Sequence, residues 1–252
     1  MWLDAYERRC RLAPGLLALI PVAVVITALG VRSAPVVSGA LSIVSLAGGP
    51  VLLASFVRGR GHDAQDRLWR NWGGSATTRA LRLREPAANT VRRDAWRQAV
   101  ESVTKVRLLS STEEAAEPAR ADDTIEVAVD QLRERTRTEA FPLVTAENRN
   151  YGFERNFYGM RATARLIALI SGILVVALII VRNVSGIHPV APTAYVLGVL
   201  IDAVVLVGWL ALPSEKRTRT TAERYAHQLF QAAVTLSNTT ESADSPKSGA
   251  DA

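Results

Sequence analysis

Four long stretches without charged side chains dominate this sequence and limit what it can fold into. Leu12–Val31 has 20 uncharged residues, Ser33–Val57 has 25 and Leu166–Val181 has 16, while Asn183–Pro213 has 31 residues with Asp202 as its only formal charge. A helix that crosses a bilayer needs about 20 apolar residues, at ~1.5 Å of rise each. The four stretches therefore predict four transmembrane helices, and they exclude a soluble monomer.

The positions of the basic residues predict how the spans are oriented. The two short loops within the paired spans carry almost no basic residues, whereas the segment 58–162 has 18 Arg and one Lys against 16 acidic residues. Loops rich in Lys and Arg stay on the cytoplasmic side. Both termini and the central segment are therefore expected in the cytoplasm. Arg supplies 27 of the 30 basic residues, which is typical of a GC-rich bacterial genome and predicts a bacterial inner (plasma) membrane.

The sequence thus predicts an all-α membrane protein in which two transmembrane helical hairpins flank a mainly helical cytoplasmic domain. The apolar core of the first span exceeds the ~7–15 residues of a signal peptide, which favours a retained hairpin. The predicted segments are an interfacial helix over 1–12, a first hairpin over 13–57 (spans about 13–31 and 36–57), the cytoplasmic domain over 58–162, a second hairpin over 163–213 (spans about 163–182 and 193–213), an amphipathic helix over 214–236 and a disordered tail over 237–252.

Apolar spacing and capping residues predict several helices within the central domain. His62–Trp72 has helical spacing and stops at two glycines, and Asn89 or Thr90 can cap the helix that follows. The polar stretch 110–118 is expected to be a loop. Glu147–Met160 is expected to run straight into the third span.

The two halves of the central domain carry opposite charge. Arg58–Ser110 has 12 basic and 5 acidic residues, and Ser111–Glu147 has 4 basic and 10 acidic residues. One interpretation is that the halves pack together and offset each other. The other is that the basic half binds an anion, such as a nucleotide, nucleic acid or anionic lipid head groups. The sequence leaves both open.

Asp202 is the most informative single residue. It lies near the middle of the fourth span, where an acid costs at least ~2.5 kcal/mol. In an assembly around an axis it would form a ring of carboxylates, which is how cation pores select ions. The alternative is a protonated Asp202 that is hydrogen-bonded to Ser42 or Ser45 and holds two helices together.

A stripe of small and polar residues follows one face of the second predicted span. Its members are spaced i, i+4, i+7 and i+11, and we predict that they line a pore together with Asp202: Ser38, Ser42, Ser45 and Gly49. Close packing against a neighbouring helix explains the same pattern.

Two segments combine aromatic residues with Asn and Arg, a mixture suited to bases and phosphates. An aromatic belt with arginines that reach the membrane interface is the alternative explanation. The candidate ligand-binding residues are Trp69, Arg70, Asn71, Trp72, Asn148, Arg149, Tyr151, Arg155 and Asn156.

No enzyme is predicted. The chain has three histidines, too few for a metal-dependent phosphohydrolase, and it lacks a Walker loop, a GxSxG and an HExxH motif. No cofactor and no metal site are expected. The single cysteine excludes a disulfide within the chain.

The string Tyr151-Gly152-Phe153-x-Arg155-Asn156-x-x-Gly159, preceded by Asn148, with Trp72-Gly73-Gly74-x-x-Thr77-Thr78 upstream, covers about 30 residues. It resembles small bacterial four-span membrane proteins that are encoded beside nucleotidyltransferases, such as the membrane effector of Hailong-type anti-phage defence. The resemblance implies an oligomeric channel, and a nucleotidyltransferase partner whose nucleotide or oligonucleotide signal controls it.

The function predicted from these features is an oligomeric inner-membrane channel or membrane-disrupting effector that is gated through its cytoplasmic domain. A non-conducting membrane anchor or scaffold, whose cytoplasmic domain recruits another protein, is the alternative. The bilayer and further copies of the chain are the expected partners in either case.

Overall fold

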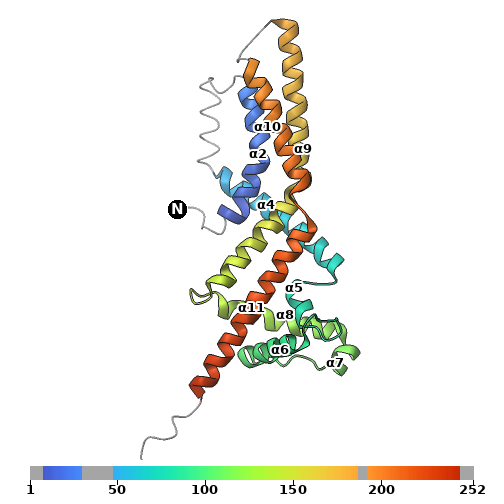
Figure 1. Ribbon diagram of the computed structural model, residues 1–252, viewed down its shortest axis with the longest axis vertical. Helices are drawn as coiled ribbons and strands as arrows, with labels where there is room; N and C mark the ends of the chain where they lie inside the picture. The colour runs from blue at the N-terminus through green and yellow to red at the C-terminus, as the bar shows by residue number, and fades with distance from the viewer. Residues whose placement is uncertain (1–7, 30–47, 187–191, 245–252) are drawn as a thin grey trace, which may run out of the picture. The chain divides into compact units, whose positions relative to one another are not determined.

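The computed structural model describes residues 8–29, 48–186 and 192–244, and within these ranges the chain is helical and contains no strand (Figure 1). This confirms the all-α fold class for the described residues. The helices are η1 (Arg8–Leu12), α2 (Ala13–Ala28), α4 (Gly49–Trp72), α5 (Ala76–Leu81), α6 (Thr90–Thr104), α7 (Ser111–Ala116), α8 (Pro118–Thr136), α9 (Pro142–Ser185), α10 (Pro192–Ala211) and α11 (Glu215–Asp244).

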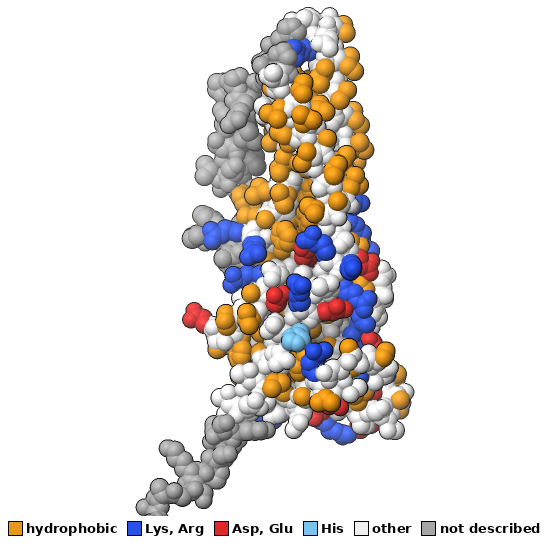
Figure 2. Space-filling view, in the orientation of Figure 1, with side chains coloured by type: hydrophobic (Ala, Val, Ile, Leu, Met, Phe, Trp, Pro, Cys, Tyr) orange, Lys and Arg blue, Asp and Glu red, His pale blue; other side chains and the backbone are white. Residues whose placement is uncertain are grey.

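Three of the described helical stretches are long and apolar enough to cross a membrane: Arg8–Ala28, Pro142–Ser185 and Thr193–Ala211. Large apolar side chains on α2, α9 and α10 are exposed, and Figure 2 shows hydrophobic groups over the visible faces of α9 and α10. Exposed apolar surface of this extent marks an interaction with a membrane or another protein. Of the second predicted span, residues 36–47 lie outside the described residues.

The chain divides into two compact units, of which the first comprises Met1–Leu68 and Gly152–Thr218. Its central cluster draws one aliphatic or aromatic side chain from each of several helices. Val57 of α4, Phe157 of α9 and Trp209 of α10 are buried together, and the rings of Phe157 and Trp209 lie 4.5 Å apart. These contacts hold α4, α9 and α10 around one core.

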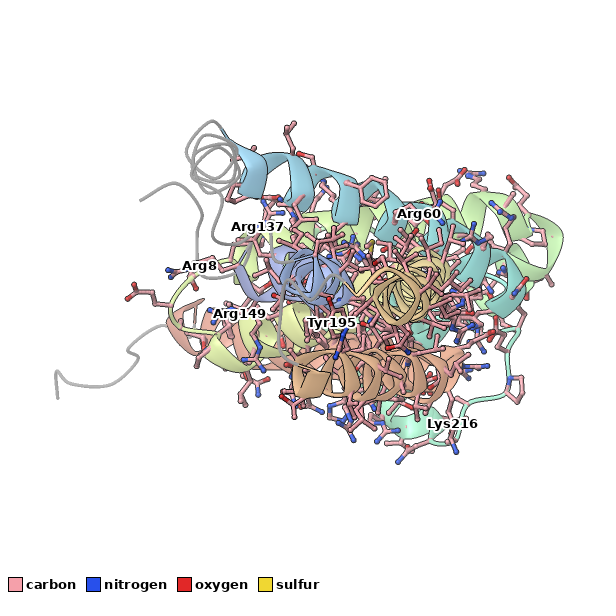
Figure 3. The ribbon with its side chains drawn as sticks, turned by 90° about the horizontal axis from the view of Figure 1, so that it is seen from above. Arg8, Arg60, Arg137, Arg149, Tyr195 and Lys216 are labelled. Atoms are coloured by element: carbon pink, nitrogen blue, oxygen red, sulfur yellow. The ribbon has the colours of Figure 1, made fainter. Side chains whose placement is uncertain are left out.

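A second cluster of the first unit joins α2, α9 and α10 through Ala28, Val175 and Tyr195. The Tyr195 ring is buried, and the guanidinium of Arg182 lies 5.1 Å from its centroid. Figure 3 labels this tyrosine. A cation over an aromatic face gains energy without an acid, so Arg182 has a favourable position at the end of an apolar helix.

Helices α4 and α9 cross at two glycines. A Cβ atom on Gly159 would lie 2.7 Å from the carbonyl carbon of Arg60 and 2.9 Å from the nitrogen of Gly61. Beside this crossing the buried Asn156 donates from Nδ2 to the backbone oxygen of Cys10, at 2.7 Å. The crossing therefore depends on the absence of a side chain, and Asn156 ties the N-terminal helix to it.

Helix α9 is a single helix of 44 residues whose only proline is its first residue. This confirms the prediction that Glu147–Met160 continues into the third span. Pro142–Tyr151 belongs to the second unit and Gly152–Ser185 to the first.

The second unit comprises Trp69–Tyr151 and Arg219–Ala252. Its core contains Leu81 of α5, Val100 of α6 and Leu132 of α8, all fully buried. The rings of Tyr151 and Tyr225 stack at 6.5 Å, which joins α9 to α11 within this unit.

Two boundaries differ from the sequence-based predictions. The predicted loop 110–118 contains helix α7, which starts at a capping box: Ser110 Oγ accepts from the Glu113 N–H, and Glu113 accepts from the Ser110 N–H at 2.8 Å. These hydrogen bonds lower the pKa of Glu113 to about 2. A short polar helix of this kind has no apolar period, so the apolar pattern could not reveal it.

The predicted end of the C-terminal helix at residue 236 is too early, because α11 continues to Asp244. Ser237 is buried, and its hydroxyl donates to the oxygen of Val234, while Thr239 donates to the oxygen of Thr235. Polar side chains here bond to the carbonyls of the helix itself, so a polar composition does not end it.

We expect Gly159→Ala to destabilise the protein by about 1–3 kcal/mol, because the new methyl group would force backbone atoms of α4 and α9 apart. Thermal unfolding of the purified protein in detergent, followed by circular dichroism, measures this. Gly59→Ala is the matched control, since nothing lies within 4 Å of its Cβ position in α4. Equal melting temperatures for the two variants would contradict the close crossing.

Candidate functional site

Asp202 lies in α10, and its residue is only 4% exposed. Neither carboxylate oxygen has a hydrogen-bond partner within the described part of the chain. An acid in this position is costly in a membrane-spanning helix unless it meets a cation, a donor or water. What stabilises the Asp202 carboxylate is therefore the main question that the apolar helices raise.

Asp202 lines a hollow of about 360 Å³ on the surface of α9 and α10. The hollow is almost wholly apolar, and Asp202 is its one charged member among the described residues. The other residues that line it are Ala168, Leu169, Gly172, Ile173, Val176, Val199, Ala203 and Leu206. A Cβ on Gly172 would meet nothing within 4 Å, so the surface is open at this point.

The two arginines that flank the apolar part of α9 make other contacts. Arg165 donates from Nε to the oxygen of Trp209 at 3.0 Å, near the C-terminal end of α10, where helix carbonyls lack intrahelical partners. Arg182 lies over Tyr195. Neither forms a described ion pair with Asp202.

The predicted pore stripe is only partly described. Ser38, Ser42 and Ser45 lie outside the described residues, and Gly49 is the first residue of α4. Lining of a pore by this stripe stays a prediction, as does a hydrogen bond from Ser42 or Ser45 to Asp202.

The predicted ligand-binding residues are divided between the two units. Arg155 and Asn156 belong to the first, and the others belong to the second: Trp69, Arg70, Asn71, Trp72, Asn148, Arg149 and Tyr151. A common pocket for all of them stays a prediction.

Several residues of the aromatic segment have structural contacts. Besides Asn156, which bonds to Cys10, Arg155 donates to Gln65 Oε1 at 2.8 Å. The guanidinium of Arg161 lies 3.5 Å from the centroid of the Tyr158 ring and donates to the backbone oxygen of Tyr158. These contacts fit the alternative in which the segment packs helices and places arginines near a membrane interface.

The basic and acidic halves of the central segment contact each other inside the second unit. Arg82 and Arg84 both bind the carboxylate of Asp122, at 2.7 to 2.9 Å. Glu114, which is 1% exposed, accepts from the backbone N–H groups of Leu83 and Arg84 and from the Arg84 side chain. The opposite charges thus hold the unit together, as the first of the two interpretations predicts.

This network also sets the ionisation of its members. Burial alone would raise the pKa of Asp122, but the hydrogen bonds from Arg82 and Arg84 outweigh burial and lower it. Burial alone would likewise lower the pKa of Arg82, and the bonds to Asp122 and Glu85 raise it instead. A carboxylate with a depressed pKa stabilises the fold above its ordinary pKa and loses that contribution as the pH falls through the folded value.

Burial has the largest effect on the pKa of His62 and lowers it. Arg155 and Arg58 lower this pKa further, and Asp66 opposes them. Among the described residues no group of three or more His, Cys, Asp or Glu could hold a metal ion.

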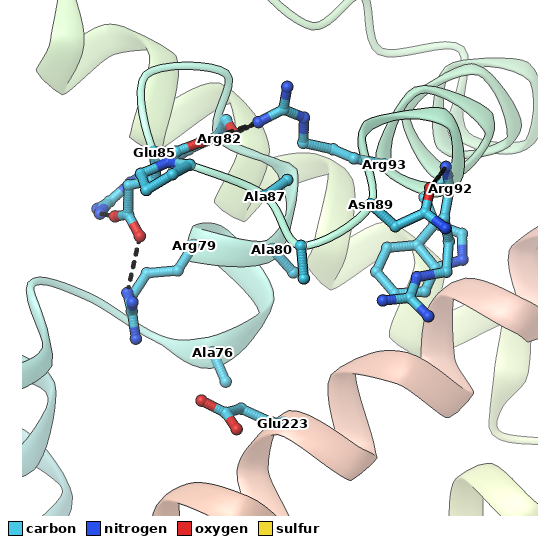
Figure 4. A pocket seen from close by; sticks show the side chains of 13 residues that line it. Ala76, Arg79, Ala80, Arg82, Glu85, Ala87, Asn89, Arg92, Arg93 and Glu223 are labelled. Carbon is cyan, nitrogen blue, oxygen red and sulfur yellow. Dashed lines mark hydrogen bonds and ion pairs between the residues drawn. The ribbon is translucent and has the colours of Figure 1, made fainter.

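Sequence reasoning missed a cleft in the second unit, which we call the Trp96 cleft. It consists of two adjoining hollows. One, of about 210 Å³, lies beside α5 and the start of α6 (Figure 4), and the other, of about 750 Å³, is also lined by α9 and α11. Residues of both hollows are Ala76, Ala80, Ala88, Arg92, Trp96 and Glu223. In the sequence, Trp96 has apolar helical spacing with Val100 and Val103, and only the fold brings α11 to it.

No protein-family model, curated protein or solved structure matches this chain.

We expect Glu114→Gln to destabilise the protein by about 2–3 kcal/mol, because it removes the negative charge from a buried group that accepts several hydrogen bonds. Thermal unfolding in detergent measures the loss. Glu117→Gln is the control, since Glu117 pairs with Arg120 on the exposed surface and such pairs contribute less than about 1 kcal/mol. A loss no larger than that of the control would mean that the contact between the charged halves does not stabilise the unit.

Proposed function

We propose that the protein is an oligomeric, multi-pass channel of a bacterial inner membrane, which opens in response to its cytoplasmic part. The observation that carries this proposal is Asp202, a buried carboxylate in a membrane-spanning helix with no hydrogen-bond donor among the described residues. A carboxylate that faces water in a pore is stable, whereas one that faces lipid is not.

Assembly of several copies would satisfy this residue. The hollow beside Asp202 is flanked by the small residues Ala168 and Gly172, and small residues allow helices in membranes to approach closely. A neighbouring subunit on this face would shield the hollow from lipid and bring copies of Asp202 around one axis, where water in the pore would solvate them. A ring of acids favours cations over anions.

The proposed topology has four spans with both termini in the cytoplasm. Support comes from the three helices that are long and apolar enough to cross a membrane, from the uncharged stretch Ser33–Val57 and from the arginine-rich segments that flank the spans.

Control from the cytoplasmic side requires a mechanical connection. Helix α9 provides a candidate, because it runs without an internal proline from the second unit into the apolar stretch of the first. A change around its first turns would be carried along a rigid helix. The resemblance of the segment from Asn148 to Gly159 to effectors of anti-phage defence supports a nucleotide-type signal, made by a nucleotidyltransferase encoded nearby.

In liposomes that contain the purified protein, we expect an ion flux whose preference for cations falls severalfold in Asp202→Asn and is retained in Asp202→Glu. Loss of the negative charge, and not of the side chain's bulk, explains the difference. Dye-based flux assays with cation and anion gradients measure it, with nucleotides added on the cytoplasmic side.

Identical selectivity of the wild type and Asp202→Asn would contradict the role of Asp202. Absence of flux from the wild type, with and without nucleotides, would favour the non-conducting anchor or scaffold, in which Asp202 only joins helices.

A further inference from the structure

Three hydrogen-bond donors of the Trp96 cleft have no acceptor among the described residues. The guanidinium of Arg92 lies 5.2 Å from the centroid of the Trp96 ring and pairs with no described acid. Arg224 of α11 lines the larger hollow without a described ion pair. Trp96 is 7% exposed, yet its indole Nε1 has no hydrogen-bond partner.

An unsatisfied buried N–H is unfavourable, by about 1–3 kcal/mol. Trp96 keeps this position because its ring packs in the core of the second unit, 5.3 Å from Phe230 and 5.4 Å from His227. The Trp96 side chain also lines both hollows, and a ligand acceptor that reached Nε1 would remove the penalty.

The charge of the cleft favours an anion. Five arginines and three glutamates line the two hollows, which gives a net charge of +2. Arg79 and Arg82 are both bound to Glu85, and Arg93 donates to the backbone oxygens of Arg82 and Glu85. Arg92 and Arg224 therefore remain as the lining arginines without a described hydrogen bond from the guanidinium, beside Glu147 and Glu223. Helix α6 also begins here, at the Asn89 cap, and a helix N-terminus carries partial positive charge.

We propose that the Trp96 cleft binds a small, multiply charged anion that carries phosphate groups. Guanidinium groups match the geometry of phosphate oxygens and bind them through paired hydrogen bonds. The larger hollow, of about 750 Å³, has the dimensions of a small-molecule site, which are about 300–1,000 Å³. Arg92 and Arg224 supply the charge, and the Trp96 indole N–H supplies a fixed donor from the core.

This site goes beyond the channel proposal and stands without it, since binding is measured without ion flux. If the chain is a gated channel, the same anion becomes a candidate for its signal, and that consequence alone rests on the proposed function.

The test is isothermal titration calorimetry of the full chain in neutral detergent, with inorganic tripolyphosphate as the probe. We expect Arg92→Gln to weaken binding roughly tenfold to hundredfold, because it removes a charged donor. Trp96→Phe removes a neutral donor and is expected to weaken binding by about fivefold. Glu223→Gln removes a lining acid and is expected to strengthen binding. Arg120→Gln is the control of equal charge change, because Arg120 is exposed and paired with Glu117.

Absence of tripolyphosphate binding to the wild type, or equal weakening by Arg92→Gln and Arg120→Gln, would overturn the proposal. Thermal unfolding of each variant separates loss of the site from loss of the fold.

A phosphate can also come from a lipid head group, so the titration is repeated in nanodiscs of phosphatidylcholine with and without phosphatidylglycerol. Unchanged affinity assigns the cleft to a soluble anion. Weaker binding with phosphatidylglycerol, seen in the wild type and absent in Arg92→Gln, assigns it to the head group. Binding that has no effect on ion flux would support the anion site and would show that the site does not gate the channel.

Discussion

The crossing of α4 and α9 at Gly61 and Gly159 is the contact on which the first unit depends. Backbone meets backbone there, and a Cβ on Gly159 would clash with Arg60 and Gly61. Because the helices approach so closely, Val57 and Phe157 reach the same core as Trp209 of α10. Small residues between membrane helices allow the same close approach of two backbones. Other large apolar side chains of α9 and α10 are exposed outside this core.

Much of the secondary structure follows from local signals in the sequence. Asn89 caps α6, two glycines end α4, and the apolar run that predicts the third span belongs to one continuous α9. The capping box of Ser110 and Glu113 also matches the local pattern Ser-x-x-Glu. A search for apolar periodicity does not detect a polar helix of six residues. Local rules succeed where the determining atoms are a few residues apart.

The candidate sites were harder to predict because they depend on contacts between distant parts of the chain. Asn156 was predicted to bind a ligand, which stays a prediction, and the fold adds a bond to Cys10, 146 residues away. Trp96 looked like an ordinary core residue, and α11 turns its surroundings into a cleft. Only Asp202 could be identified as a candidate from local sequence, because a charged residue within an apolar stretch is unusual wherever the neighbouring helices lie.

The two charged halves illustrate why net charge alone could not decide what the central segment binds. Arg82 and Arg84 pair with Asp122 and Glu114, so part of the basic charge is used within the fold. In the Trp96 cleft, Arg92 and Arg224 form no ion pair among the described residues, although Glu147 and Glu223 share the lining. Trp96 lines the same hollow, and its indole N–H has no partner among the described residues. An anion that enters the cleft would meet Arg92 and Arg224 beside Glu147 and Glu223, so its binding depends on direct contact with the two guanidinium groups. Glu147 belongs to α9, the helix that also contributes Ala168 and Gly172 to the hollow at Asp202.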